Sequence, residues 1–202
     1  MRKYIAGLAT AFTLLVAAPV QGQVKWDAPF MVSPSAPAGW GLYLVDPSPG
    51  DGIGVLSTWR GGGPLGFRLG LAEDRADRVA VYGGVDFSGR LIRASDDFPL
   101  DVDWVVGGGM SAGDHVHLGF PFGVSLGRAI DAEGIWLNPY FTPRVILDAW
   151  LGRDDPPGDS MELNLAVDLG VDLAFDPGWA IRFGATVADR SALAIGFSFR
   201  LR

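Results

Sequence analysis

Residues 161–175, Met-Glu-Leu-Asn-Leu-Ala-Val-Asp-Leu-Gly-Val-Asp-Leu-Ala-Phe, decide the fold of this chain. Every odd-numbered position from Met161 to Phe175 is apolar, whereas the even-numbered positions carry Glu, Asn, Asp, Gly and Ala. A period of two is the pattern of a β-strand that presents one apolar face. The stretch therefore predicts a long strand rather than a helix.

The same alternation recurs along most of the chain. It continues from Trp179 to Val187, after the turn Asp176-Pro177-Gly178, and again from Leu193 to Leu201. Weaker upstream repeats, separated by Gly, Pro and Asp clusters, bring the total to about ten strands. We expect them near residues 40–45, 53–60, 64–72, 79–90, 100–111, 114–127, 135–148, 160–175, 178–188 and 191–201.

Strands joined by short turns over the whole chain predict an all-β fold, an antiparallel up-and-down barrel of about ten strands, with eight as the alternative. An even number of strands places both ends of the barrel chain on one side. Pro121, Pro139 and Pro143 fall inside predicted strands. Because proline lacks the N–H that a strand ladder needs, we expect bulges or loosened pairing there.

The composition excludes several functional classes. The 202 residues have a net charge of −7, only two lysines and no basic run, which argues against a nucleic-acid partner. There is no cysteine, so disulfides, thiolate metal sites and cysteine nucleophiles are excluded. Gly107-Gly108-Gly109 lacks the Lys-Ser/Thr of a phosphate-binding loop, and we interpret it as a point of strand curvature. We expect no cofactor, no metal and no enzymatic activity.

The N-terminus has the layout of a secretory signal peptide. Arg2 and Lys3 precede an apolar stretch at residues 5–18, and small residues follow. We expect cleavage after Gly22, with Ala18 as the alternative. A membrane anchor is a weaker reading, because a spanning helix needs about 20 apolar residues. The predicted organisation is a signal peptide at 1–22, an extended leader at 23–39 and a β-barrel at 40–202.

The residues that share the polar face indicate which way the strands face. Glycines such as Gly66, Gly119 and Gly184 recur there beside Ala and Ser, and large Leu, Phe, Val and Trp side chains lie opposite. Small residues suit a narrow lumen and bulky ones suit a lipid belt. This favours a transmembrane barrel. The alternative is an exported soluble barrel that turns its apolar face inward and binds an apolar ligand.

Tryptophan positions support the membrane reading. By the predicted strand directions, four tryptophans fall near one rim, as in an interfacial aromatic belt, although ordinary core tryptophans are the alternative. They are Trp40, Trp59, Trp136 and Trp179.

The signal peptide, the alternating strands and the last strand, Leu193 to Leu201, together resemble the small single-chain bacterial outer-membrane β-barrel superfamily. The resemblance covers nearly all of the chain after the signal peptide. It implies a Gram-negative cell envelope, outer-membrane lipids as surroundings and the barrel-assembly machinery as a partner during biogenesis. Members typically end on an aromatic residue, whereas here Phe199 is followed by Leu201 and Arg202.

Charged residues on the polar face predict a lumen cluster. A tight hairpin at residues 176–178 puts Asp172 opposite Arg182, and we expect Arg200 near both. Facing charges neutralise each other where unpaired ions are costly, so a structural plug is favoured over an ion-selective constriction.

A second candidate site is the rim group Asp114, His115 and His117. With Ser111 in the preceding strand, a histidine there would form a nucleophile–base pair, as in an outer-membrane hydrolase. Rim polar residues without chemistry, or a weak metal site, are the favoured alternative. The predicted function is thus a non-enzymatic outer-membrane barrel, structural or adhesive, or a narrow, porin-like passive channel.

Overall fold

The computed structural model describes residues 24–35, 38–47, 52–73, 79–113, 115–154, 157–176 and 178–200, apart from the side chains of residues 152–159. All regular structure in these ranges is β-strand. No helix in the described part of the chain is long and apolar enough to cross a membrane. The strands are β1 (Gly39–Asp46), β2 (Gly54–Arg60), β3 (Leu65–Glu73), β4 (Val79–Ile92), β5 (Asp101–Ala112), β6 (Val116–Gly127), β7 (Ile130–Ala132), β8 (Ile135–Asp154), β9 (Pro157–Asp176), β10 (Trp179–Ala188) and β11 (Ala192–Phe199).

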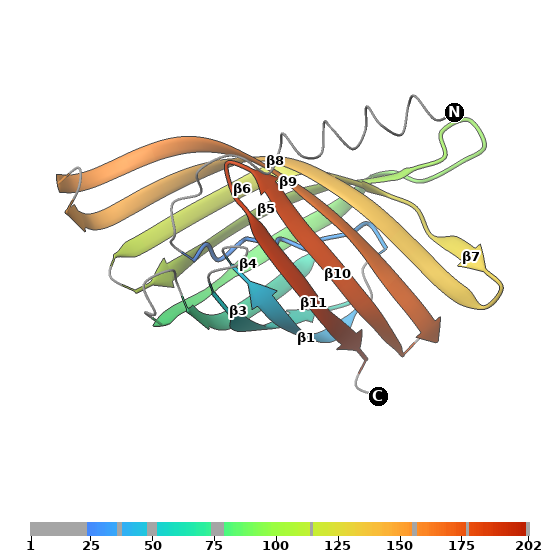
Figure 1. Ribbon diagram of the computed structural model, residues 1–202. Coiled ribbons are helices and arrows are strands. Elements are labelled where there is room, and N and C mark those ends of the chain that lie inside the picture. The colour runs from blue at the N-terminus through green and yellow to red at the C-terminus, as the bar shows by residue number, and fades with distance from the viewer. Residues whose placement is uncertain are drawn as a thin grey trace, which may run out of the picture.

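Ten of these strands close into an antiparallel barrel (Figure 1). Neighbours in the chain pair with each other, β6 pairs with β8, and β1 pairs with β11 to close the ring. The predicted antiparallel barrel of about ten strands is confirmed, and the eight-stranded alternative is wrong.

The closed barrel has two rims. The terminal rim holds the start of β1, the end of β11 and the turn at residues 61–64. The hairpin rim holds the end of β5, the start of β6, the turn at 189–191, the end of β8 and the start of β9.

The structure differs from the predicted strands at β7 and at the β8–β9 hairpin. β7 is an eleventh strand that pairs only with the start of β8, through Ile130↔Leu137 to Ala132↔Ile135. β8 and β9 are longer than predicted and pair with each other out to Asp154↔Pro157, beyond the end of their neighbours. The expected strands left out residues 149–159, where proline and glycine disfavour strand structure, but cross-strand pairing overrides that local preference.

Loosened pairing occurs beside two of the three prolines. The β5–β6 ladder has no paired residues between Val106↔Phe122 and Gly109↔Gly119, where Pro121 lies. The β6–β8 ladder is likewise interrupted next to Pro143. The register is the same on both sides of each gap, so the missing N–H groups weaken the ladder without shifting it.

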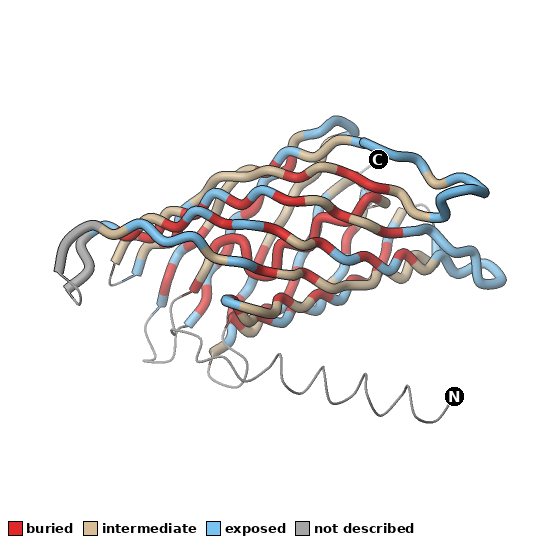
Figure 2. Tube along the Cα trace, turned by 90° about the horizontal axis from the view of Figure 1, so that it is seen from above, coloured by how far each residue is buried: buried red, intermediate tan, exposed pale blue. Residues whose placement is uncertain are grey.

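Side chains on the strands alternate between a buried inner face and an exposed outer face, which Figure 2 shows as alternating colours along each strand. On β3, Leu69 is 65% exposed while Arg68 is buried. On β8, Asn138, Thr142 and Arg144 are buried. The outer face is therefore apolar and the inner face polar, which is the inverse of a water-soluble barrel.

Residues 24–35, the lumen segment, run through the inside of the barrel without joining the sheet (Figure 1). Trp26 and Phe30 are fully buried. The segment supplies Val24, Trp26, Phe30, Met31 and Val32 to a hydrophobic core that is completed from the wall by Tyr43, Val45, Leu56, Ala72, Ala80, Tyr82, Val105 and Ala194. The barrel interior is thus packed by its own N-terminal chain.

Lumen tyrosines lie directly over cross-strand glycines. The pairs are Tyr43↔Gly196 and Tyr82↔Gly70, and a third is formed by Tyr140 over Gly170. A methyl group on Gly196 would come within 2.6 Å of the Tyr43 ring, which is closer than van der Waals contact. These glycines therefore make room for aromatic rings inside a narrow barrel.

Candidate functional site

The indole of Trp26 fills a socket made of glycines. Side chains added at Gly84, Gly107, Gly109 or Gly119 would all overlap this ring, and the closest approach at Gly107 would be 2.9 Å to the indole. The Trp26 indole N–H donates to the Gly119 carbonyl at 3.0 Å. Gly107 and Gly109 therefore make room for the Trp26 ring. This role goes beyond the strand curvature that the sequence predicted for these glycines.

Asp27 is the hub of a buried ion network. Its carboxylate accepts from Arg144 on β8 and from Arg190 in the β10–β11 turn, and its backbone carbonyl accepts from Arg144 Nη2 at 2.8 Å. Arg144 also donates to Asp168 at 2.5 Å, and Arg190 donates to Asp148. Unpaired buried ions cost several kcal/mol, so this mutual pairing is what lets the charges lie inside.

Arginines also bind the backbone of the lumen segment. Arg68 donates to the carbonyls of Pro29, at 3.1 Å, and of Phe30. Arg182 donates to the Met31 carbonyl at 3.0 Å. Met31 has a left-handed φ of 52°, which is uncommon for a residue with a side chain. The turn of the backbone at Met31 directs successive carbonyls to arginines on β3 and β10.

Further along, hydroxyl groups take over this role. Ser125 donates to the Val32 carbonyl at 2.7 Å, and Thr142 donates to Ser125 at 2.8 Å. Arg90 donates to the Pro34 carbonyl at 2.7 Å near the terminal rim. Side chains of the wall thus satisfy backbone groups that a strand ladder would otherwise satisfy.

Asp172 and Arg182 lie opposite each other in the β9–β10 register, joined by a bond of 2.7 Å from Nε to Oδ1. Ser33 donates to the other oxygen of Asp172 at 3.0 Å. Arg200, which we expected near both, is exposed after the end of β11, and its backbone N–H donates to the Gly178 carbonyl. The third contributor comes instead from the lumen segment.

His117 is fully buried, and its Nε2 lies 2.8 Å from Asp148 Oδ1. Trp150 packs against the imidazole with 4.6 Å between ring centroids. Ser111 is the cross-strand partner of His117 and is fully buried, and its hydroxyl has no hydrogen-bond partner among the described residues. The three residue types of a nucleophilic triad are therefore near one another, but they lie under a closed surface.

The predicted rim group also includes His115 and Asp114. His115 is partly exposed in the turn between β5 and β6. Asp114 lies outside the described residues. No group of His, Cys, Asp and Glu within the described ranges is arranged to hold a metal ion.

The four predicted rim tryptophans all lie at the terminal rim. Trp40 is the cross-strand partner of Trp59, and both Trp40 and Trp179 pair with Phe199. Trp136 pairs with Ala174 near the end of β9. Phe175 stacks on Trp179 at 4.9 Å and joins the same band. The rim therefore carries a belt of aromatic rings.

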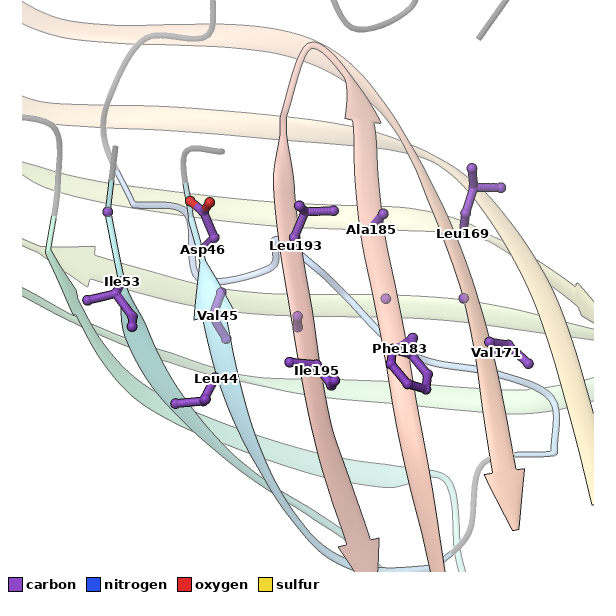
Figure 3. A pocket seen from close by; sticks show the side chains of 14 residues that line it. Leu44, Val45, Asp46, Ile53, Leu169, Val171, Phe183, Ala185, Leu193 and Ile195 are labelled. Carbon is purple, nitrogen blue, oxygen red and sulfur yellow. The ribbon is translucent and has the colours of Figure 1, made fainter. Parts of the chain in front are cut away.

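The outer wall carries an apolar groove of about 670 Å³ over β1, β11, β10 and β9, next to the hairpin rim (Figure 3). Its floor is Ala185, the small member of an outward-facing row, whose cross-strand partners are Leu169 and Leu193. Leu44, Phe183 and Ile195 complete the sides, and Asp46 lies at the upper edge. The groove is open and almost entirely apolar.

No protein-family model matches this chain, and no curated protein matches it either. Fold and site alone therefore define the class: a closed ten-stranded antiparallel β-barrel whose lumen is filled by its own N-terminal segment and by paired ions.

Proposed function

We propose that this protein is an integral β-barrel of a bacterial outer membrane, exported by its signal peptide, and that it serves a structural or adhesive role without catalysis. The observation that carries the proposal is the inverted distribution of polarity. Large apolar side chains such as Leu69, Phe122 and Leu163 are 62–72% exposed on the outer face, and the ions lie inside. Exposed apolar surface on this scale fits lipid rather than water.

The lumen supports this proposal over the soluble alternative. A soluble barrel that binds an apolar ligand needs an apolar cavity, whereas the inner face here carries buried Asp and Arg pairs such as Arg144–Asp168. The apolar groove around Ala185 lies on the outer wall, where a lipid chain would fill it. The aromatic belt at the terminal rim has the position of an interfacial girdle.

The filled interior favours a sealed barrel over the narrow channel. One inner cavity, beside Met31, Arg68 and Arg182, has a volume of about 20 Å³. That is space for about one water molecule. Conduction would require the lumen segment to leave, so we propose that the resting barrel is closed.

The test combines localisation with a substitution whose expected result differs between membrane and water. The wild-type chain, expressed with its signal peptide, should appear in the outer-membrane fraction, require detergent for extraction and migrate differently on gels before and after heating. Leu69→Lys, in the middle of β3, should destabilise an embedded barrel by about 2–4 kcal/mol. In a soluble barrel the same exposed position should tolerate lysine within about 0.5 kcal/mol.

Val79→Lys is the matched control. Val79 is 62% exposed, close to Leu69 in exposure, but lies at the hairpin rim where β4 begins. Near a membrane interface its cost should fall to about 0–1 kcal/mol. Equal tolerance of lysine at both positions, together with solubility without detergent, would overturn the proposal.

A further inference from the structure

The lumen segment crosses the barrel from one rim to the other. At the hairpin rim, Lys25 Nζ lies 3.7 Å from the centroid of the Trp150 ring, and Asp27 is bound by Arg190 of the β10–β11 turn. At the terminal rim, the Pro34 carbonyl accepts from Arg90 near the end of β4. The lumen segment therefore begins at the hairpin rim, passes through the lumen and leaves at the terminal rim, where β1 begins.

The segment is held by wall side chains rather than by the sheet. Arginines and hydroxyls donate to successive backbone carbonyls along the segment, and the Phe30 N–H donates to Asp168 Oδ1 at 3.1 Å. For the described residues, the only backbone–backbone hydrogen bond within residues 24–35 is local, from Ala28 to Lys25. The wall therefore binds both carbonyls and an N–H of a segment that has no regular secondary structure, and these are groups that any polypeptide backbone offers.

Two side-chain positions add selectivity. The glycine socket admits the Trp26 indole, and the arginine pair Arg144 and Arg190 binds the carboxylate of the next residue, Asp27. Both groups lie on the hairpin-rim half of the lumen. The preferred ligand is therefore a peptide segment that presents an aromatic residue followed by an acid.

We infer that the lumen is a polypeptide-binding site, occupied by residues 24–35 of the same chain, and that this threading places Lys25 at the rim opposite Arg200. If the barrel lies in a membrane, which is the proposed function, Lys25 and Arg200 lie on opposite sides of that membrane. An even number of strands alone would place both ends together; threading through the lumen separates them.

The absence of cysteine makes the occupancy of the lumen testable by a single disulfide. A methyl group on Gly184 would lie 2.9 Å from Met31 Cγ, which matches the distance from Cβ to the opposite sulfur in a disulfide. The full-length Met31→Cys/Gly184→Cys variant should form an intramolecular bond in the oxidising envelope. The control, Met31→Cys/Ala185→Cys, places the second thiol on the outer face and should stay reduced. Absence of the first bond, or equal oxidation of both variants, overturns the lumen site.

The direction of threading is tested by labelling intact cells with a maleimide on a polymer too large to enter the periplasm. Lys25→Cys should share its accessibility with Gly113→Cys at the hairpin rim. It should differ from Gly62→Cys at the terminal rim, where an added side chain meets open space. Arg200→Cys should behave like Gly62→Cys. Accessibility of Lys25→Cys that matches the Gly62 variant overturns the inference.

These readouts separate the two proposals. If all four cysteines are labelled equally from a protein that is soluble without detergent, the membrane proposal fails, whereas the Met31–Gly184 disulfide still decides the lumen site. If the protein is embedded but Lys25→Cys and Gly62→Cys share one side, the membrane proposal stands and the threading inference fails.

Discussion

The indole nitrogen of Trp26 donates to the carbonyl oxygen of Gly119 across 93 positions of sequence, at 3.0 Å. The bond joins the lumen segment to the wall of β6 at a point where a Cβ atom would come within 2.8 Å of the same nitrogen. The size of the Trp26 ring thus fits the space left by Gly119, and a double-mutant cycle can measure the coupling energy between the two residues.

Removing the ring and filling the socket should have coupled effects. Trp26→Ala should lower the free energy of unfolding by about 3–5 kcal/mol, because a fully buried ring leaves a cavity. Gly119→Val should also destabilise, since its neighbours are the Trp26, His117 and Asp148 side chains. The double variant should lose less than the sum, with a coupling of about 0.5–3 kcal/mol, measured by denaturant titration in lipid vesicles. Simple additivity would contradict the socket.

Arg182 should be far more important for stability than Arg200. Arg182→Met leaves Asp172 as a buried carboxylate whose remaining hydrogen-bond partner among the described residues is Ser33, and should cost about 3–5 kcal/mol. Adding Asp172→Leu should recover part of that loss, because the unpaired charge is removed as well. Arg200→Met, at an exposed position, should change stability by no more than about 0.5 kcal/mol. The idea of a charge-paired lumen does not survive if the two single variants are equally stable.

Asp27→Asn tests the ion hub without changing shape. The substitution removes the negative charge shared by Arg144 and Arg190 and should cost about 3–5 kcal/mol. We also expect faster proteolysis of the lumen segment, because its docking is weakened. Asp97→Asn, in the exposed loop between β4 and β5, is the control and should leave both measurements unchanged. Equal protease resistance of the two variants would argue that the hub does not hold the segment.

Ser111 and His117 distinguish structure from catalysis. Ser111→Ala removes a buried hydroxyl that lacks a partner in the described structure, so stability should change little or rise. His117→Ala removes the imidazole beside Asp148 and should cost at least about 1.5 kcal/mol. Neither variant should alter hydrolysis of phospholipid or ester substrates. A wild-type hydrolase activity that both substitutions abolish equally would establish the triad that we do not propose.

The barrel could be predicted from the sequence because a period of two is a local property. Alternation from Met161 to Phe175 fixes which side chains share a face, and the Asp176-Pro177-Gly178 turn fixes the register that pairs Asp172 with Arg182. Arg200 was misplaced because a strand end is not fixed by alternation. β11 ends at Phe199, and Arg200 is exposed.

The lumen segment could not be predicted in the same way. Residues 24–35 have no period, since their backbone is bound by side chains from distant strands such as Arg68 and Arg182. One sequence feature pointed to a filled lumen: the inner-face side chains are too small to fill the barrel by themselves. Glycines crowd the inner face, while Trp26 and Phe30 lie in a leader without a strand to join. The volume that the inner glycines leave free could have been assigned to the aromatic side chains of residues 24–35.

The contact of Tyr43 with Gly196 lies between β1 and β11, the two strands whose pairing closes the sheet into a barrel. β1 and β11 are the first and last strands of the barrel, and their pairing, in which Tyr43 lies over Gly196, closes the ring. A slip of two residues would put the ring over Ala194 or Ser198, whose side chains would occupy the same space. The fit of Tyr43 over Gly196 therefore favours the observed register of the two closing strands over one shifted by two residues.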